Sequence, residues 1–181
     1  MLIRDATAAD VPGVAAIWNP IIRDTVITFW PTERSEAEIA ALVADRQAQG
    51  HAFLIADDDG VAGFGTYAQF RGGSGYARSQ EHTIYLAPKR QGQGAGRLLL
   101  HAIEDHAVAR GHRLMIGGIT GSNAASVAFH AAMGYAEWGR IPNAGWKFGT
   151  YHDLVLMGRD LAQPRPAGGV NAPLSSDGIR G

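Results

Sequence analysis

Thr83-Ile84-Tyr85-Leu86-Ala87-Pro88-Lys89-Arg90-Gln91-Gly92-Gln93-Gly94-Ala95-Gly96-Arg97-Leu98-Leu99-Leu100 is a stretch that predicts a strand, a tight glycine-rich turn and a helix. Its first four residues are β-branched or aromatic, which favours a strand, and Pro88 ends that strand because proline offers no N–H to a sheet. Gly92, Gly94 and Gly96 open a helix that we expect to reach about Arg110. The first N–H groups of a helix are unpaired and carry partial positive charge, and glycines let an anion approach them. The stretch is therefore a candidate phosphate site.

The glycine spacing separates this turn from two common phosphate loops. A dinucleotide fingerprint separates its last two glycines by two residues, whereas here Gly94 and Gly96 are separated by one. A P-loop is excluded because no Gly-Lys-Ser/Thr follows. Taken alone, the pattern also fits a glycine-rich turn that binds no ligand.

The rest of the chain supplies strands and helices in the order β-α-α-β-β-β-α-β-α-β-β. A capping box at Thr7 and a second at Ser35 start two helices, and Pro20 is expected to end the first. The predicted strands cover 2–4, 51–56, 61–70, 81–86, 114–119, 135–141 and 153–157, and the predicted helices cover 7–19, 35–50, 94–110 and 123–133. We expect one domain over 1–163 and a disordered tail over 164–181, which is rich in Pro, Gly and Ser.

Composition narrows the class of protein. The chain has 181 residues, 46% apolar, with a net charge of −1 and no long basic run, which disfavours nucleic-acid binding. It has no cysteine, which excludes disulfides, a cysteinyl acyl-enzyme and cysteine–zinc sites. His101 and His106 are five positions apart and do not share a helix face, so no metal is expected. Without a signal peptide or a membrane-spanning run, we expect a cytoplasmic protein.

Several blocks of sequence, in order along the chain, resemble one family. They are Glu81-His82-Thr83-Ile84-Tyr85-Leu86, the loop 91–96, Gly121-Ser122-Asn123-Ala124-Ala125-Ser126, His130-Ala131-Ala132-Met133-Gly134-Tyr135 and Lys147-Phe148-Gly149-Thr150-Tyr151-His152-Asp153-Leu154. Together they resemble the GCN5-related N-acetyltransferases (GNAT), especially those that act on phosphinothricin and methionine sulfoximine. The resemblance implies an α/β fold with a curved, mixed sheet of seven strands, flanked by about four helices.

The resemblance also implies acetyl-CoA as the co-substrate. Coenzyme A would lie where the fourth and fifth strands separate, with its pantetheine arm added along a free strand edge. The residues that would hold it are Ile84, Tyr85, Leu86, Gln91, Gly92, Gln93, Gly94, Ala95, Gly96, Arg97, Asn123 and Ser126. An Asn at a helix start can equally be a simple cap.

Acetyl transfer to an amine requires a proton acceptor, because an ammonium group has no lone pair. The resemblance assigns Glu81 as the general base; the alternative is a surface glutamate at a strand start. His130 matches a second family position, where it assists proton transfer or simply packs. The backbone N–H of Leu86 could donate to the thioester oxygen, and Tyr135 is a weaker candidate for protonating the thiolate.

The acceptor is expected to be a small amino-acid analogue, such as methionine sulfoximine, methionine sulfone or phosphinothricin. Arg71 would bind its carboxylate, and the pocket would also include Gly75, Tyr76, Thr28 and Phe29. The family often has Arg or Lys at the position of Gln93, Trp at that of Phe70, and larger side chains at Gly72 and Gly73. These departures affect the predicted identity of the acceptor more than that of the acetyl donor.

Two alternatives remain at this stage. A GNAT enzyme could act on a protein N-terminus, a polyamine or an aminoglycoside, although Arg71 disfavours cationic acceptors. A non-catalytic acyl-CoA sensor would bind the cofactor without needing Glu81. The resemblance also implies a homodimer, for which the segment from Trp138 to Trp146 could supply an interface.

Overall fold

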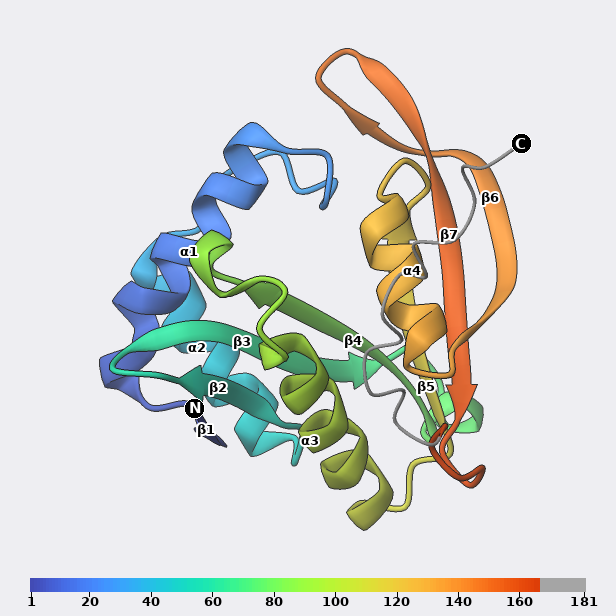
Figure 1. Ribbon diagram of the computed structural model, residues 1–181, viewed down its shortest axis with the longest axis horizontal. Coiled ribbons are helices and arrows are strands. Elements are labelled where there is room, and N and C mark those ends of the chain that lie inside the picture. The colour runs from blue at the N-terminus through green and yellow to red at the C-terminus, as the bar shows by residue number, and fades with distance from the viewer. Residues whose placement is uncertain (167–181) are drawn as a thin grey trace, which may run out of the picture.

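A computed structural model describes residues 1–166. One seven-stranded sheet runs through it in the order β1-β2-β3-β4-β5-β7-β6 (Figure 1). The strands are β1 (Leu2–Asp5), β2 (Phe53–Asp57), β3 (Val61–Gln69), β4 (Ser79–Leu86), β5 (Leu114–Thr120), β6 (Ala136–Lys147) and β7 (Thr150–Asp160). The helices are α1 (Val11–Asp24), α2 (Glu36–Ala48), α3 (Ala95–Ala109) and α4 (Ala124–Ala132). The predicted element order and fold class are confirmed.

The sheet is mixed because only β4 and β5 pair in parallel; every other neighbouring pair is antiparallel. Parallel strands cannot be joined by a hairpin, so the chain crosses from β4 to β5 through α3. This crossover places the glycine-rich turn after the last residue of β4, beyond the half of the strand that pairs in parallel with β5.

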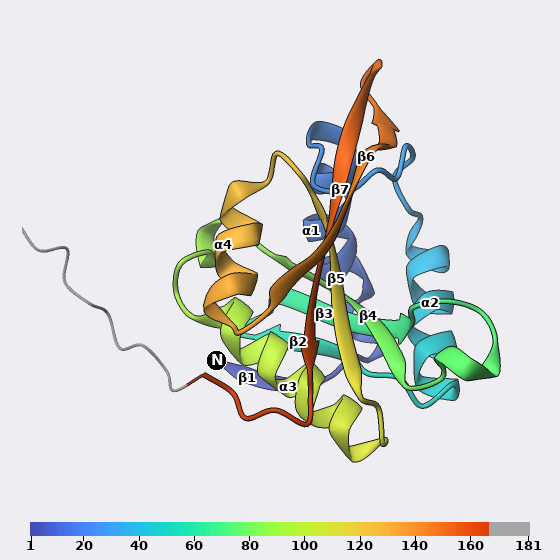
Figure 2. The same ribbon diagram turned by 90° about the vertical axis from the view of Figure 1, so that its right-hand side faces the viewer.

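Helices cover both faces of the sheet, α1 and α2 on one face and α3 and α4 on the other (Figure 2). Alternation along β2 divides the core accordingly: Phe53 and Ile55 pack with α1 and α2, whereas Leu54 and Ala56 pack with α3. All four of these side chains are buried.

Local signals set most helix ends. Ser35 and Glu38 form the predicted capping box of α2. Gly50, Gly111 and Gly134 follow α2, α3 and α4 with φ angles of 74°, 78° and 85°. Only glycine adopts such angles without strain, which is why these helices end there.

Pro20 does not end α1, so that prediction was wrong. The helix continues through it to Asp24. Pro20 removes one helical hydrogen bond, but the following turn buries Ile22, which is 1% exposed. Burial of that side chain offsets the missing bond.

The last two strands differ from their predicted lengths. β6 and β7 extend well beyond their predicted ranges and form a long antiparallel ribbon that carries exposed Trp138, Trp146 and Tyr151. The homodimer that we associated with this segment stays a prediction. Of the predicted tail, only 164–166 are described, and Arg165 there pairs with Glu104 of α3; residues 167–181 lie outside the described part. Within residues 1–166, none of the helices has both the length and the apolar character that crossing a membrane requires.

Candidate active site

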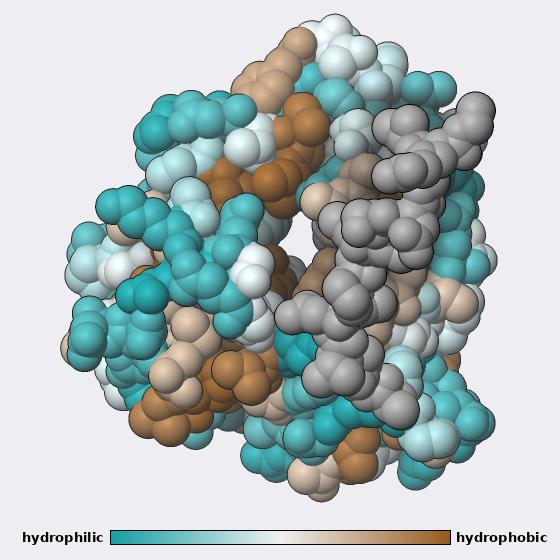
Figure 3. Space-filling view, in the orientation of Figure 1, coloured by the Kyte–Doolittle hydropathy of each residue, from teal (hydrophilic) through white to brown (hydrophobic). Residues whose placement is uncertain are grey.

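β4 and β5 separate half-way along their length. They pair from Ser79↔Leu114 to His82↔Gly117 and no further. β3 nevertheless stays paired with β4 to its end, at Gly63↔Leu86. The last half of β4 therefore has a partner on one edge and an open gap on the other. Figure 3 shows the surface hollowed at the centre of the molecule, where the ribbons of β4 and α4 stand apart in Figure 1.

The register determines which backbone groups face the gap. Ala87 N–H donates to Ala62 O of β3 at 2.9 Å, so Ala87 bonds toward β3. Hydrogen-bonding direction alternates along a strand, so Tyr85 also bonds toward β3, while Ile84 and Leu86 direct their N–H and C=O groups into the gap. This edge can accept an added strand, as predicted for residues 84–86.

The glycine-rich turn leads from this open edge into α3. Gly92 and Gly94 adopt φ angles of 74° and 85°, and a side chain on either would meet nothing within 4 Å. Gly94 is the N-cap of α3, and no side chain caps the helix. The first amides of α3 are thus free to bind an anion, which is the arrangement predicted for the pyrophosphate. Gly96 also has a packing role, because its Cα faces the ring of Phe129 in α4.

α4 completes the α3 side of the gap. Asn123 Oδ1 accepts a hydrogen bond from Ser126 N–H at 3.1 Å, so Asn123 does cap the helix. Both residues also line a small cavity of about 70 Å³ in the gap, together with Ile84. The two interpretations of Asn123, as cap and as ligand contact, are therefore compatible.

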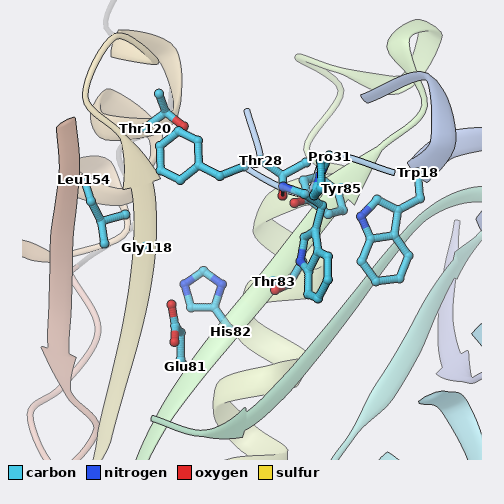
Figure 4. Close-up of a pocket in the computed structure, with 12 residues that line it drawn as sticks. Trp18, Thr28, Pro31, Glu81, His82, Thr83, Tyr85, Gly118, Thr120 and Leu154 are labelled. Atoms are coloured by element: carbon cyan, nitrogen blue, oxygen red, sulfur yellow. Dashed lines mark hydrogen bonds between the residues drawn. The ribbon is translucent and has the colours of Figure 1, made fainter. Parts of the chain in front are cut away.

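The opposite side of β4 opens into a larger cavity of about 410 Å³. Figure 4 shows Glu81 and Thr83 on β4 facing Gly118 of β5 and Leu154 of β7 across this space. The lining residues come from α1, the following loop and strands β4, β5 and β7: Trp18, Thr28, Phe29, Trp30, Pro31, Glu81, His82, Thr83, Tyr85, Gly118, Thr120 and Leu154.

Glu81 has the environment of a general base. Burial raises the pKa of its carboxyl. Its Oε1 lies 2.8 Å from the point where a Cβ on Gly118 would stand, so it lies directly against the bare backbone of β5. No described residue forms a hydrogen bond or an ion pair with this carboxylate, which leaves it available to a water molecule or an amine.

His130 lies on the other side of β4, stacked on His82. The ring centroids are 5.1 Å apart and the planes are inclined by 17°. His130 Nδ1 donates to Ser126 O at 2.7 Å, so Nε2 of the neutral ring is an acceptor, and no described residue bonds to it. Neutral His130 can thus take a proton at Nε2 but has none to donate there.

His82 is the main feature that the sequence analysis missed. It is 6% exposed, and neither ring nitrogen has a partner among residues 1–166. Burial, with a smaller contribution from His130, lowers the pKa of His82 to about 3, so the ring is neutral. Gly117 makes room for it, since a Cβ there would stand 3.0 Å from His82 Nε2. Strand alternation alone could have placed His82 opposite Glu81, but the stacking depends on α4.

The loop after α1 closes the large cavity. Lys147 Nζ of β6 donates to Thr28 O at 2.7 Å, and Thr120 Oγ1 of β5 donates to Val26 O at 2.5 Å. Phe29 stacks on His152 of β7, with 5.9 Å between centroids. Thr28 and Phe29, which we predicted to wall the acceptor pocket, both line the large cavity, whereas the buried Lys147 was not anticipated.

Three other predicted acceptor residues lie elsewhere. Arg71, Gly75 and Tyr76 belong to the exposed loop between β3 and β4, and none lines the large cavity. The Arg71 guanidinium lies 5.7 Å from the ring of Phe70. Tyr135 packs in the core, and its hydroxyl donates to Glu104 Oε1 at 3.1 Å. No cluster of metal-ligating side chains is found within residues 1–166.

Comparison with known proteins agrees with this geometry. Residues 17–135 match the model of the acetyltransferase (GNAT) family. An L-methionine sulfoximine/L-methionine sulfone acetyltransferase of Pseudomonas aeruginosa is 35% identical over 91% of this chain and 97% of its own length.

Two solved structures extend the comparison. A GNAT-superfamily phosphinothricin acetyltransferase from Sinorhizobium meliloti, in complex with acetyl-CoA, has a TM-score of 0.84 and 32% identity, covering 92% of this chain and 94% of that one. A ribosomal-protein-alanine N-acetyltransferase from Brucella melitensis has a TM-score of 0.86 and 34% sequence identity, and the match covers 88% of this chain and 99% of that one. Similar folds therefore serve different acceptors.

Proposed function

The chain belongs to the GNAT acetyltransferase family, and we propose that it transfers the acetyl group of acetyl-CoA to the α-amine of a small amino-acid analogue. Methionine sulfoximine, methionine sulfone and phosphinothricin are the leading acceptors. The observation that carries this proposal is the pair of spaces on either side of β4: a strand edge open to pantetheine, and a cavity lined by Glu81.

The donor would occupy the gap between β4 and β5. Its pyrophosphate would contact the amides that begin α3, and its pantetheine arm would pair with the backbone of Ile84 and Leu86. Asn123 and Ser126 would line the other wall. The thioester would then lie at the deep end of the gap, where β4 and β5 come together.

The reaction would be a direct attack within a ternary complex. Glu81, directly or through one water, takes a proton from the ammonium of the acceptor. The free amine then attacks the thioester carbon, whose developing oxyanion would be stabilised by a backbone N–H of the open edge; Ile84 lies nearer to Glu81 than Leu86, the candidate from sequence, and is the better placed of the two. The nitrogen gives up a second proton as the carbon–sulfur bond breaks, the leaving thiolate takes up a proton, and the amide and the free thiol of coenzyme A are released.

Thiol release tests the proposal. The protein is mixed with acetyl-CoA and L-methionine sulfoximine, and free thiol is followed together with the acetylated product by mass spectrometry. Release that depends on the acceptor supports the proposal. No release above the rate without acceptor would remove this acceptor class.

A second acceptor class follows from the similarity to the ribosomal-protein-alanine enzyme. A short peptide that begins with alanine is therefore assayed in parallel. The large cavity holds about 410 Å³ and is walled by aromatic side chains, which suits a free amino acid better than a peptide chain.

A further inference from the structure

The guanidinium of Arg34 lies over two indole rings that belong to the wall of the large cavity. Its Cζ is 4.6 Å from the centroid of Trp18 and 4.3 Å from that of Trp30. Both tryptophans line the cavity. A guanidinium whose faces are covered in this way keeps only its edge, where the N–H groups lie, free for hydrogen bonding.

Other contacts fix Arg34 in this place. The Asn19 side chain binds its backbone twice, since Asn19 Oδ1 accepts from Arg34 N–H and Asn19 Nδ2 donates to Arg34 O, both at 2.9 Å. The Trp18 ring also packs against two aromatic rings of the core. Its centroid lies 5.2 Å from that of Phe64 and 6.0 Å from that of Tyr85. The arginine is thus held in position before any ligand binds, which lowers the entropy cost of binding.

The hydrogen-bond donors in this stack are unused. Arg34 Nε is buried and has no acceptor among the described residues, and the guanidinium forms no ion pair with any described carboxylate. The Nε1–H of Trp18, a side chain 4% exposed, is also buried; it lies close to the Tyr85 hydroxyl but forms no well-aligned hydrogen bond within residues 1–166. Unsatisfied buried donors are costly, and an oxyanion is the group that satisfies two of them best.

The stack lies further along β4 than the proposed base. Trp18 packs on Tyr85, four residues beyond Glu81 on β4, which corresponds to roughly 13 Å along a strand. An α-amine and an α-carboxylate are separated by only two bonds through one carbon. An acceptor whose amine is served by Glu81 would therefore bring the end of its side chain, not its α-carboxylate, toward Arg34.

We propose that Arg34, held between Trp18 and Trp30, binds an oxyanion at the far end of the acceptor's side chain. It thereby favours acceptors with a side-chain phosphinate or carboxylate over neutral acceptors of the same shape. This inference rests on the proposed function and adds a specificity-determining residue outside the loop of Arg71.

The test uses two acceptors of nearly identical shape. Phosphinothricin and methionine sulfone differ at the end of the side chain, which is an anionic phosphinate in one and a neutral sulfone in the other. The kcat/KM for each is measured in the wild type, Arg34→Gln, Arg34→Lys and the matched control Arg71→Gln. We expect Arg34→Gln to lower the phosphinothricin-to-sulfone ratio about tenfold or more, Arg34→Lys to restore part of it, and Arg71→Gln to leave it unchanged.

The inference would be overturned if Arg34→Gln lowered kcat/KM equally for both acceptors, because a purely structural role affects both alike. It would also be overturned if kcat/KM changed for neither. Failure of the proposed function looks different: the wild type would then acetylate neither acceptor. In that case the indole fluorescence of wild type and Arg34→Gln is titrated with phosphinothricin. A saturable change that only the wild type shows supports the inference, and any other result overturns it.

Discussion

The carboxylate of Glu81 occupies the space that a side chain on Gly118 would need, with 2.8 Å between Oε1 and the site of a Cβ. Gly118→Ala should therefore displace the carboxylate and lower kcat about tenfold or more, since such misplacement is costly in general base catalysis. Coenzyme A affinity, measured by calorimetry, should stay within a factor of two or so. Gly72→Ala is the control, because a Cβ there meets nothing within 4 Å. Equal activity in the two variants would contradict the role of this contact.

Replacing Glu81 itself should separate chemistry from binding. Glu81→Gln is expected to lower kcat about a hundredfold without changing coenzyme A affinity, because only proton transfer is removed. Burial raises the pKa of Glu81, and a base must be deprotonated. The wild-type kcat/KM should therefore fall as the pH drops through that raised pKa, and the variant should lack this acid limb. If Glu81→Gln kept the pH dependence of kcat/KM that the wild type shows, a residue other than Glu81 would be the general base.

The αL glycines at the two ends of α3 provide a matched pair. Gly94 and Gly111 have φ angles of 85° and 78°, and a Cβ on either meets no atom within 4 Å. Alanine at either should cost about 1 kcal/mol in unfolding free energy through backbone strain. Only Gly94→Ala should also weaken coenzyme A binding, by about tenfold, since the other end of the helix is roughly 22 Å away. If calorimetry gave the two variants the same affinity for coenzyme A, the proposal that this turn binds the pyrophosphate would be wrong.

The loop that walls the large cavity is anchored by Lys147 and Thr120. Lys147→Met leaves Thr28 O without its donor, so the loop should loosen and the acceptor KM should rise about threefold to tenfold. Thr120→Val removes the bond to Val26 O and should act in the same direction. Steady-state kinetics with acceptor varied at saturating acetyl-CoA measures both. A change in the KM for acetyl-CoA instead would show that the anchors serve the donor side.

His82 should make folding stability depend on pH. Its folded pKa of about 3 lies below the unfolded value of about 6.5, so between these the unfolded state binds the extra proton. Stability should thus be lost as the pH falls below about 6.5, by up to about 1.4 kcal/mol per pH unit for this residue. Glu81, with a raised pKa, contributes a smaller slope of opposite sign.

His82→Phe, which keeps a ring against His130, should reduce this slope by about one proton between pH 6 and pH 4.5. Urea unfolding at several pH values measures it. The five other histidines with lowered pKa values remain in both proteins: His51, His101, His106, His112 and His130. Their contribution cancels in the difference, so identical slopes would mean that His82 is protonated in the folded state.

Local sequence signals predicted much of the fold. The β-branched strand, Pro88 and the glycines of the turn act within a few residues of one another, so they could be interpreted without the rest of the chain. The same holds for Ser35 and Glu38, which cap α2. The prediction for Pro20 was wrong because the helix beyond it is stabilised by burial of Ile22, and that burial depends on tertiary packing.

The candidate site could be predicted only in part. Motif and family resemblance led to the prediction of Glu81 and of residues 84–86, and the structure places both around the gap and the large cavity. The stacking of His82 on His130, and the enclosure of Arg34 by Trp18 and Trp30, join segments far apart in sequence. No local pattern encodes such contacts. The position of Arg71 depends on the path of an exposed, glycine-rich loop that sequence leaves open.

Because the parallel ladder between β4 and β5 is short, coenzyme A bound in the proposed gap would be a structural component as well as a reactant. Only the first half of each strand joins β1–β4 to the sheet formed by β5–β7. A pantetheine arm hydrogen-bonded to β4 and enclosed by α4 would fill the space where the two halves of the sheet do not pair, and would connect them. Occupancy by the thioester would then govern how rigidly the acceptor cavity is held, so donor binding would prepare the enzyme for the amine.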